Sequence, residues 1–395
     1  MKLRDANIDI FCQVVDNFGD AGFSFRLARA LKMRRVDRQI RLFINELHAL
    51  GHLVPELDIN RAQQNIEGVD IIIINDQLVK RIQHLQFASL VIESLASPVP
   101  EVFRKQVYSQ SQLILILEHL TAEPEFEAMH GLAAPTGYPV PRYMINQGFT
   151  AKSAGILIED NFQETIQSVA GKQLKWRQKW LKPYTDVLPF EPETIKTGSL
   201  FSYDHDLSAL LRDLQTEQEP TILFVLGDLS QQSVRQALLH EKEAVWLKPD
   251  VAGLGEVYLL FPEMFSQKDY DLLLITMDFN LVRGEESLAR AILAGKPFLW
   301  QAYDQGDNYQ LVKVNALLKV LEHYAEGSSV LNGYEQLTRA YNWCFTPTHS
   351  AMPKENYCYF LKNFATIQRW LNRLRRDLLA HGGLILALER FVESL

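Results

Sequence analysis

The sequence predicts an α/β protein with two domains, each built on a largely parallel β-sheet. Short runs of Ile, Leu and Val alternate with stretches of helical periodicity along most of the chain. At 395 residues the chain exceeds the usual size of one hydrophobic core. Polar loops follow several apolar runs, and in open α/β sheets such loops form the edge that binds ligands.

The composition is that of an ordinary globular protein, with 47% hydrophobic and 22% charged residues. A net charge of −8 argues against direct nucleic-acid binding. The three widely spaced cysteines suit a reducing compartment rather than a disulfide framework. We find no signal-peptide core and no apolar run of membrane-spanning length, so we expect a cytoplasmic protein without membrane contact. The ten histidines lack metal-ligand spacing, so no metal is expected.

The first domain is expected to hold five strands, and a polar loop follows the first of them. The strands are predicted over residues 7–15, Ile40–Ile44, Val69–Ile74, Ala88–Glu93 and Gln112–Leu117. The loop Asp16-Asn17-Phe18-Gly19-Asp20 precedes a helix, and Asp20 stands where a helix N-cap would fall. The two aspartates can be a turn residue and a cap. At a sheet edge one of them could instead serve as a general base.

The domain boundary is predicted in residues 182–197, which carry prolines and show no clear period. We therefore assign residues 1–184 to an N-terminal Rossmann-like domain and 185–358 to a C-terminal one. Residues 359–395 are expected to form C-terminal helices that can pack back on the N-terminal domain.

The second domain is organised around residues 271–303. The pattern predicts a buried strand over Asp271–Thr276, a loop over Met277–Gly284, a helix over Glu285–Ala294 and a strand from Phe298. The loop ends in Arg283-Gly284-Glu285-Glu286, with Ser287 next. A helix N-terminus attracts phosphate, an arginine can clamp it, and a glycine lets the backbone approach closely. The two glutamates suit sugar hydroxyls, or they only complement the helix dipole.

Two α/β domains with an acidic loop in one and a phosphate-binding loop in the other form the layout of a GT-B glycosyltransferase, in which two Rossmann-like domains face a cleft. The motifs are also similar to those of the bacterial elongation factor P arginine rhamnosyltransferase family. Residues 16–20 with Gly22 resemble that family's opening motif. Residues 278–287, DFNLVRGEES, resemble its second hallmark, usually written with RGEDS. The resemblance extends from about residue 8 to about residue 320 and includes Leu117-Glu118, Phe201-Ser202-Tyr203 and Gln267 with Tyr270.

The resemblance implies an inverting transfer of rhamnose from dTDP-β-L-rhamnose to an arginine side chain of elongation factor P. Neither a metal nor another cofactor is implied. The modified factor then helps ribosomes through proline stretches. The family places the protein acceptor and the general base on the N-terminal domain and the nucleotide sugar in the C-terminal domain.

The resemblance also implies a role for each matching residue. Asp20 would be the base or orienting carboxylate, Asp16 would hold the acceptor guanidinium or the loop, and Glu285 would contact ribose or sugar as an indispensable residue. The acceptor-side loop would be completed by Asn17, Phe18 and Gly19. The donor would be bound by Phe201, Tyr203 and Tyr270 around thymine, Gln267 at the base edge, Arg283, Gly284, Ser287 and Tyr303 at the diphosphate, and Glu286, which stands where the family usually has Asp.

Three alternatives stay open. The chain could be another metal-independent nucleotide-sugar glycosyltransferase, which acceptor tests would separate. It could also be a non-catalytic nucleotide-sugar-binding protein, although the joint presence of Asp20, Arg283 and Glu285 argues against that class. A dinucleotide oxidoreductase is disfavoured because G-x-G-x-x-G is absent.

Overall fold

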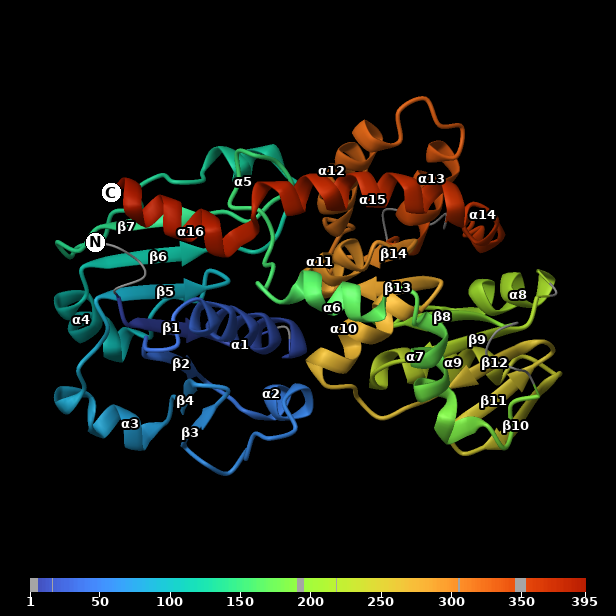
Figure 1. Cartoon of the computed structure of the whole chain (residues 1–395), viewed down its shortest axis with the longest axis horizontal. Helices are drawn as coiled ribbons and strands as arrows, with labels where there is room; N and C mark the ends of the chain where they lie inside the picture. The colour runs from blue at the N-terminus through green and yellow to red at the C-terminus, as the bar shows by residue number, and fades with distance from the viewer. Residues whose placement is uncertain (1–5, 16, 190–194, 218, 305, 345–352) are drawn as a thin grey trace. The chain divides into compact units, whose positions relative to one another are not determined.

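The computed structural model describes residues 6–15, 17–189, 195–217, 219–304, 306–344 and 353–395, which divide into two compact units (Figure 1). The first unit comprises Met1–Phe162 and Asp377–Leu395, and the second comprises Gln163–Arg376. Each unit is described by itself below. In the described part of the chain, no helix is both long and apolar enough to cross a membrane.

The first unit is built on a seven-stranded sheet in the order β3-β4-β2-β1-β5-β6-β7, with antiparallel pairing only between β3 and β4 among the described strands. The strands are β1 (Ile8–Cys12), β2 (Ile40–Ile44), β3 (Gln63–Ile66), β4 (Val69–Ile73), β5 (Leu90–Ser94), β6 (Leu113–Leu117) and β7 (Arg142–Ile145). Because β1, β5, β6 and β7 run parallel, the loops that follow them meet at one edge of the sheet.

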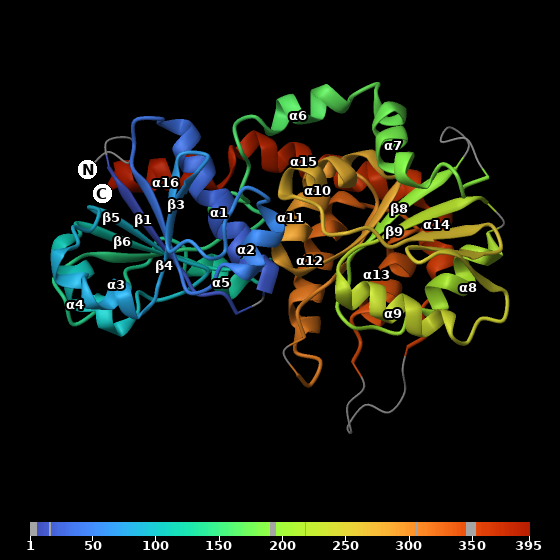
Figure 2. The same ribbon diagram turned by 90° about the horizontal axis from the view of Figure 1, so that it is seen from below.

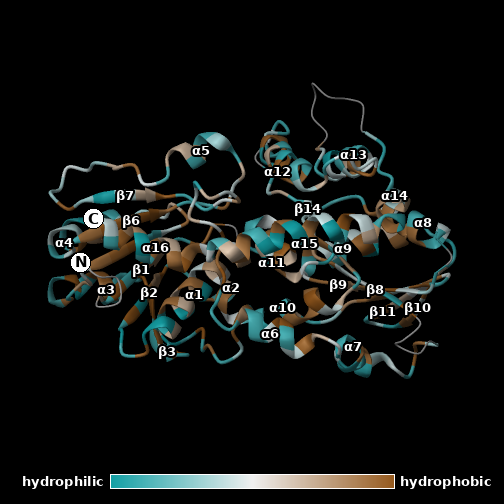
Figure 3. Ribbon diagram, turned by 45° about the horizontal axis from the view of Figure 1, so that its top comes forward, coloured by the Kyte–Doolittle hydropathy of each residue, from teal (hydrophilic) through white to brown (hydrophobic). Residues whose placement is uncertain are grey.

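Helices cover both faces of this sheet, as Figure 2 shows. They are α1 (Asn17–Arg34), α2 (His48–Leu53), α3 (Asp76–Lys80), the 3₁₀ turn η2 (Ile82–His84), α4 (Glu101–Gln110), α5 (Pro124–Ala128) and α16 (Gly383–Ser394). One core joins the strands to α1, α2 and α16, with Leu27 and Leu388 fully buried in it. The other core joins them to α4 through Phe103 and Val107. Burial on both faces explains why the central strands β1, β5 and β6 are mostly apolar, whereas the edge strand β3 is polar (Figure 3).

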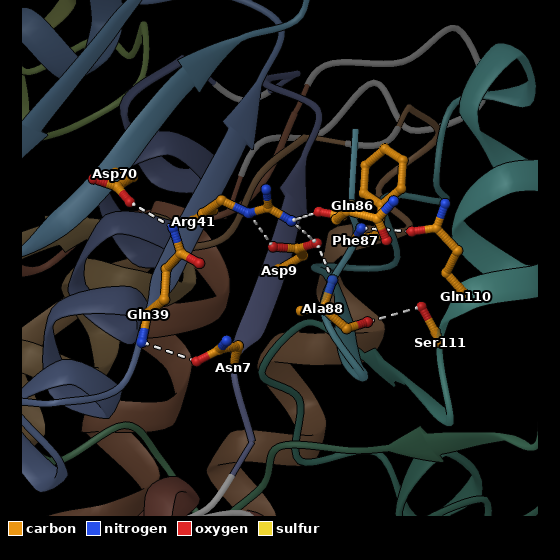
Figure 4. A network of polar contacts seen from close by, with 10 residues as sticks. All are labelled: Asn7, Asp9, Gln39, Arg41, Asp70, Gln86, Phe87, Ala88, Gln110 and Ser111. Atoms are coloured by element: carbon orange, nitrogen blue, oxygen red, sulfur yellow. Dashed lines mark hydrogen bonds and ion pairs between the residues drawn. The ribbon is translucent and has the colours of Figure 1, made fainter. Parts of the chain in front are cut away.

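A buried ion pair fixes the starts of three neighbouring strands of this sheet (Figure 4). The carboxylate of Asp9 on β1 accepts hydrogen bonds from Nε and Nη2 of Arg41 on β2, each at 2.7 Å. It also accepts one from the backbone N–H of Ala88, before β5, at 2.8 Å. These three hydrogen bonds, two of them from a cationic guanidinium, compensate the charge of the buried Asp9 carboxylate.

The second unit contains a seven-stranded sheet in the order β10-β11-β12-β9-β8-β13-β14. Its strands are β8 (Lys196–Leu200), β9 (Thr221–Val225), β10 (Ala244–Lys248), β11 (Val251–Leu254), β12 (Val257–Leu260), β13 (Phe279–Arg283) and β14 (Phe298–Gln301). The five strands from β12 to β14 are parallel, so β9, β8, β13 and β14 end side by side at one edge. Every functional side chain considered below for this unit lies on or near that edge.

The remaining described helices lie wholly or mostly in the second unit. They are α6 (Phe162–Val169), α7 (Gln173–Leu181), η3 (Lys182–Tyr184), α8 (Ser208–Thr216), α9 (Asp228–Leu238), α10 (Gln267–Thr276), α11 (Gly284–Ala294), α12 (Gln310–Tyr324), α13 (Leu331–Tyr341), α14 (Tyr357–Lys362) and α15 (Phe364–His381). With two Rossmann-like α/β units, the predicted α/β class of the GT-B type is confirmed.

The division between the units falls earlier than the predicted boundary at residue 184, because α7 packs on the second unit. Nε of Arg177 donates to the carbonyl of Thr276 at 3.1 Å, and Nε1 of Trp180 donates to the Thr276 hydroxyl at the same distance. At the other end of the chain, α16 belongs to the first unit, where Ile385 is buried in the core. The predicted linker, residues 182–197, also contains the start of β8.

Two predictions about residues 271–284 are wrong. Asp271–Thr276 is not a strand but the end of α10, whose N-cap Ser266 accepts a hydrogen bond from the backbone N–H of Asp269. This helical turn is buried nearly all round, so it lacks the apolar stripe by which a helix is recognised. Residues 277–284 are not a loop, since β13 occupies most of them. The buried Asn280 hides this strand, and its side chain is satisfied by Ser199 and the carbonyl of Leu274.

Candidate functional site

The first candidate carboxylate, Asp20, lies in the first turn of α1, just beyond the end of β1. The prediction that Asp20 is the N-cap is wrong, because the helix begins three residues earlier, at Asn17. Only 5% of Asp20 is exposed, and its Oδ2 accepts a hydrogen bond from the backbone N–H of Val15 at 2.8 Å. This bond holds the carboxylate against the loop that leaves β1. Asp20 therefore sits at the edge of the first sheet where the parallel strands end, the edge at which open α/β sheets bind ligands.

The other residues of the predicted loop, 16–19, precede Asp20 in the chain. Asp16 lies outside the described residues, and Asn17 is the first residue of α1. Phe18 packs against the first core, and its ring meets His52 edge to face at 5.9 Å. Gly19 is partly exposed. Phe18 thus anchors the start of α1 to the core, and Asp20 places a carboxylate at the sheet edge.

In the second unit, β13 ends at Arg283 and α11 begins at Gly284. Gly284 has a φ of +66°, a left-handed conformation that favours glycine. Its carbonyl accepts a hydrogen bond from Nε1 of Trp300 at 3.0 Å, which ties the start of the helix to β14. The predicted helix N-terminus is therefore present at the sheet edge, where the positive end of the helix dipole favours an anion.

Arg283 is stacked between two aromatic rings. Its guanidinium carbon lies 4.3 Å from the centroid of Phe201 and 4.6 Å from that of Tyr203. Its Nη1 donates to the carbonyl of Ser202 at 3.0 Å. Because β8 and β13 are neighbours, residues that follow β8 meet the residue that ends β13. The predicted donor-binding residues Phe201, Tyr203 and Arg283 are thus brought together in a single cluster.

Two more predicted aromatic residues extend this cluster. The ring of Tyr270 meets that of Phe201 at 5.9 Å, and the ring of Tyr303 meets that of Tyr203 at 5.6 Å, both edge to face. Burial raises the pKa of the Tyr270 hydroxyl, which keeps that group protonated. Tyr303 is 43% exposed. The cluster therefore has a partly buried side at Tyr270, whose hydroxyl oxygen is buried, and an open side at Tyr303.

Gln267 and Ser287 lie at the first turns of the two helices that flank β13. Gln267 is the first residue of α10 and is 5% exposed. Ser287 is in the first turn of α11 and is 7% exposed. Both stand near the predicted site, since α10 carries Tyr270 and α11 follows Arg283.

The two glutamates of the RGEES stretch have different cationic partners. Glu285 Oε1 lies 2.9 Å from Nζ of Lys313 on α12, and both side chains are largely buried, at 16% and 18% exposure. Glu286 Oε1 lies 3.5 Å from Nε of Arg290, one turn along the same helix. Both carboxylates are thus compensated next to a helix end that favours an anion.

Sequence reasoning missed three residues that build this site. Gln301 accepts a hydrogen bond from the backbone N–H of Tyr203 at 2.8 Å and so fixes its position. Gly227 follows β9 with a φ of +73°, and a Cβ there would lie 2.8 Å from the ring of Phe201. Lys313 lies 28 residues beyond Glu285. Of these, only Gly227 carried a signal, because it is a glycine directly after a strand.

Among the described residues, no three His, Cys, Asp or Glu side chains gather closely enough to hold a metal ion. Positive charge at the candidate site of the second unit comes from Arg283 and the start of α11.

Comparison with known proteins gives a family. The sequence profile described as "Elongation-Factor P (EF-P) rhamnosyltransferase EarP" matches residues 8–393. The chain belongs to this family. A protein-arginine rhamnosyltransferase of Pseudomonas putida is 33% identical over 347 residues, covering 82% of this chain and 83% of the relative. One of Shewanella oneidensis is 29% identical, covering 79% of this chain and 80% of the relative.

A solved structure reported as the "Structural basis for EarP-mediated arginine glycosylation of translation elongation factor EF-P" has the same fold. It matches with a TM-score of 0.61 and 23% identity, over 98% of this chain and 99% of that one. The family predicted from the motifs at residues 16–20 and 278–287 is therefore confirmed.

Proposed function

We propose that this EarP family member is an inverting glycosyltransferase that moves rhamnose from dTDP-β-L-rhamnose to an arginine side chain of elongation factor P. The observation that carries the proposal is the cluster in which Arg283 is stacked between Phe201 and Tyr203 beside the start of α11. It combines aromatic faces for a base with positive charge for a diphosphate. Family membership supports the same activity.

On the donor side, the departing diphosphate gains negative charge as the bond to the anomeric carbon breaks. Arg283 and the backbone N–H groups at the start of α11 supply fixed positive charge for it. Ser287 and Tyr303 add hydroxyl donors, and Gln267 with Tyr270 would recognise the base. Glu285 would accept hydrogen bonds from the ribose or sugar. With this charge provided by the chain itself, the proposed reaction needs no metal.

On the acceptor side, an arginine is a poor nucleophile because its positive charge is delocalised and its pKa is very high. A carboxylate within hydrogen-bond reach can orient one guanidinium nitrogen and accept the proton released when the bond between that nitrogen and the anomeric carbon forms. Asp20 is suited to this role, since its backbone contact at Val15 fixes the carboxylate at the sheet edge. Asp16 would help to hold the acceptor.

The proposal is tested by the intact mass of the acceptor. The purified chain, unmodified elongation factor P of the same organism and dTDP-rhamnose are mixed with a chelator. The factor should gain one deoxyhexosyl group, and Asp20→Ala and Glu285→Ala should each abolish the gain. Asp37→Ala and Glu326→Ala are the matched controls, because they remove exposed carboxylates from the first and second units. Both controls should transfer sugar at the wild-type rate.

No gain of mass with the wild-type chain and a folded acceptor would contradict the proposal. A gain with another nucleotide sugar, or on a small acceptor, would favour a different glycosyltransferase activity. Tight donor binding without any transfer would favour a nucleotide-sugar-binding protein. A gain that requires added metal would contradict the metal-independent part. We also propose a cytoplasmic location, where elongation factor P acts.

A further inference from the structure

The contact between Glu285 and Lys313 joins two helices of the second unit at their first turns. Glu285 is the second residue of α11, and Lys313 is the fourth residue of α12. Their Oε1 and Nζ atoms are 2.9 Å apart, and each side chain is more than four-fifths buried. An exposed pair of this kind is weak and variable, whereas a largely buried pair restrains both partners.

The start of α12 is itself anchored, so Lys313 is held in place. Gln310, the first residue of α12, donates from Nε2 to the carbonyl of Asn342 at 2.8 Å and is 1% exposed. Asn342 in turn accepts a hydrogen bond from the backbone N–H of Ala302, just beyond β14, at 2.7 Å. The position of Lys313 is therefore tied to the same sheet edge that carries Arg283.

Charge balance shows what Lys313 does at this edge. Among the described residues, the ion pairs and ring contacts around the start of α11 involve the cationic groups of Arg283, Arg290 and Lys313 and the carboxylates of Asp271, Glu285 and Glu286. The formal charges of these six groups balance, and without Lys313 the five that remain carry one excess negative charge. An uncompensated carboxylate at this helix start would oppose a diphosphate.

We propose that Lys313 is a positioning residue of the donor site. Its ammonium group neutralises Glu285 and fixes the direction of that carboxylate. Glu285 can then accept a hydrogen bond from a ribose or sugar hydroxyl beside a diphosphate without repelling it. This inference rests on the proposed function of Glu285, and it assigns to Lys313 no contact with the diphosphate itself.

The test is a double-mutant cycle on the full-length chain, with thymidine diphosphate as the probe for binding. Dissociation constants are measured by calorimetry for the wild type, Lys313→Met, Glu285→Gln and the double variant. Lys313→Met should weaken binding by about tenfold or more, because a carboxylate near the phosphates loses its counter-charge. In the Glu285→Gln background the same change should alter binding by less than about threefold.

Transfer kinetics supply the second readout. Lys313→Met should lower kcat/KM by about tenfold or more, because Glu285 loses the group that orients it and its charge opposes the diphosphate. Lys313→Arg keeps the charge and should recover most of this loss. Lys319→Met removes an exposed lysine from the same helix and should behave as the wild type. Melting temperatures within about 4 °C of the wild type show that all variants are folded.

Three results would overturn the inference. Lys313→Met with wild-type binding and kinetics would show that the pair has no role in the site. A double variant that binds thymidine diphosphate ten times more weakly than Glu285→Gln would show that Lys313 contacts the diphosphate directly. A loss in Lys313→Arg as large as that in Lys313→Met would exclude charge as the cause. A wild-type chain that neither binds the probe nor transfers sugar would instead refute the proposed function, and the inference with it.

Discussion

Replacing Gly227 with alanine should disturb both the stability of the second unit and its donor site. Gly227 has a φ of +73° and a ψ of +155°, a region that is essentially restricted to glycine and costs other residues about 1–3 kcal/mol. The new Cβ would also lie 2.8 Å from Cε2 of Phe201, against a normal carbon–carbon contact of about 3.5–4.0 Å. The ring must therefore move by about 1 Å, and such overpacking adds about 1–3 kcal/mol.

Together these costs lower the free energy of unfolding by about 2–6 kcal/mol, which a urea titration followed by tryptophan fluorescence can measure. The displaced ring also loses its stacking on Arg283, now at 4.3 Å, which is worth about 0.5–2 kcal/mol. Binding of thymidine diphosphate should weaken by about two- to thirtyfold as a result.

A second glycine provides the matched control. Gly327 has a φ of +70°, and a Cβ there would have nothing within 4 Å. Gly327→Ala should cost about 1–2 kcal/mol of stability through the backbone alone and leave binding unchanged. If Gly227→Ala matched Gly327→Ala in both measurements, or matched the wild type, the account of Phe201 packing would be refuted.

Three further predictions test other contacts. Arg283→Lys loses the flat guanidinium and its hydrogen bond to Ser202, so calorimetry should show binding of thymidine diphosphate weakened by about 0.5–2 kcal/mol, and unchanged binding would contradict the stacked geometry. Arg142→Met leaves Glu93, which is fully buried, without its cationic partner and should cost about 3–5 kcal/mol in a urea titration; a cost below about 1 kcal/mol would show that the pair is dispensable. Burial raises the pKa of the Cys12 thiol from its ordinary 9.0 to about 12, so mass spectrometry should find it unalkylated in the native chain at pH 9 and alkylated after unfolding. Because the unfolded thiol ionises first, the free energy of unfolding should fall as the pH rises from about 9 towards 12, by up to about 1.4 kcal/mol per pH unit from this group.

The helix that starts at Gly284 could be predicted from the sequence because its apolar period is regular and Gly295 ends it in a left-handed conformation. The two elements before this helix, α10 and β13, could not be predicted from the sequence. The last turn of α10 is apolar on nearly every face, so its run of Leu and Ile has the composition of a buried strand. The strand β13 contains Asn280, whose polarity is offset only by partners that become visible in the folded chain.

The same limit applies to the site. Arg283 and Glu285 stand in a short motif, so the sequence singled them out. Lys313 comes from a separate helix, and no local pattern connects it to Glu285. Stacking of Arg283 on Phe201 also depends on the strand order, because β8 lies beside β13 only through tertiary pairing. Motifs thus singled out the residues of the candidate site, whereas its supporting contacts required the structure.

The most direct measurement of the central claim is the position of the sugar on the acceptor. Elongation factor P treated with the wild-type chain and dTDP-rhamnose is digested, and its peptides are fragmented by a method that preserves glycosidic bonds. We predict that a single arginine carries one deoxyhexosyl group and that every other residue is unmodified. A sugar on any other residue type, or an unmodified factor alongside consumed donor, would contradict the assignment of this chain as a protein-arginine rhamnosyltransferase.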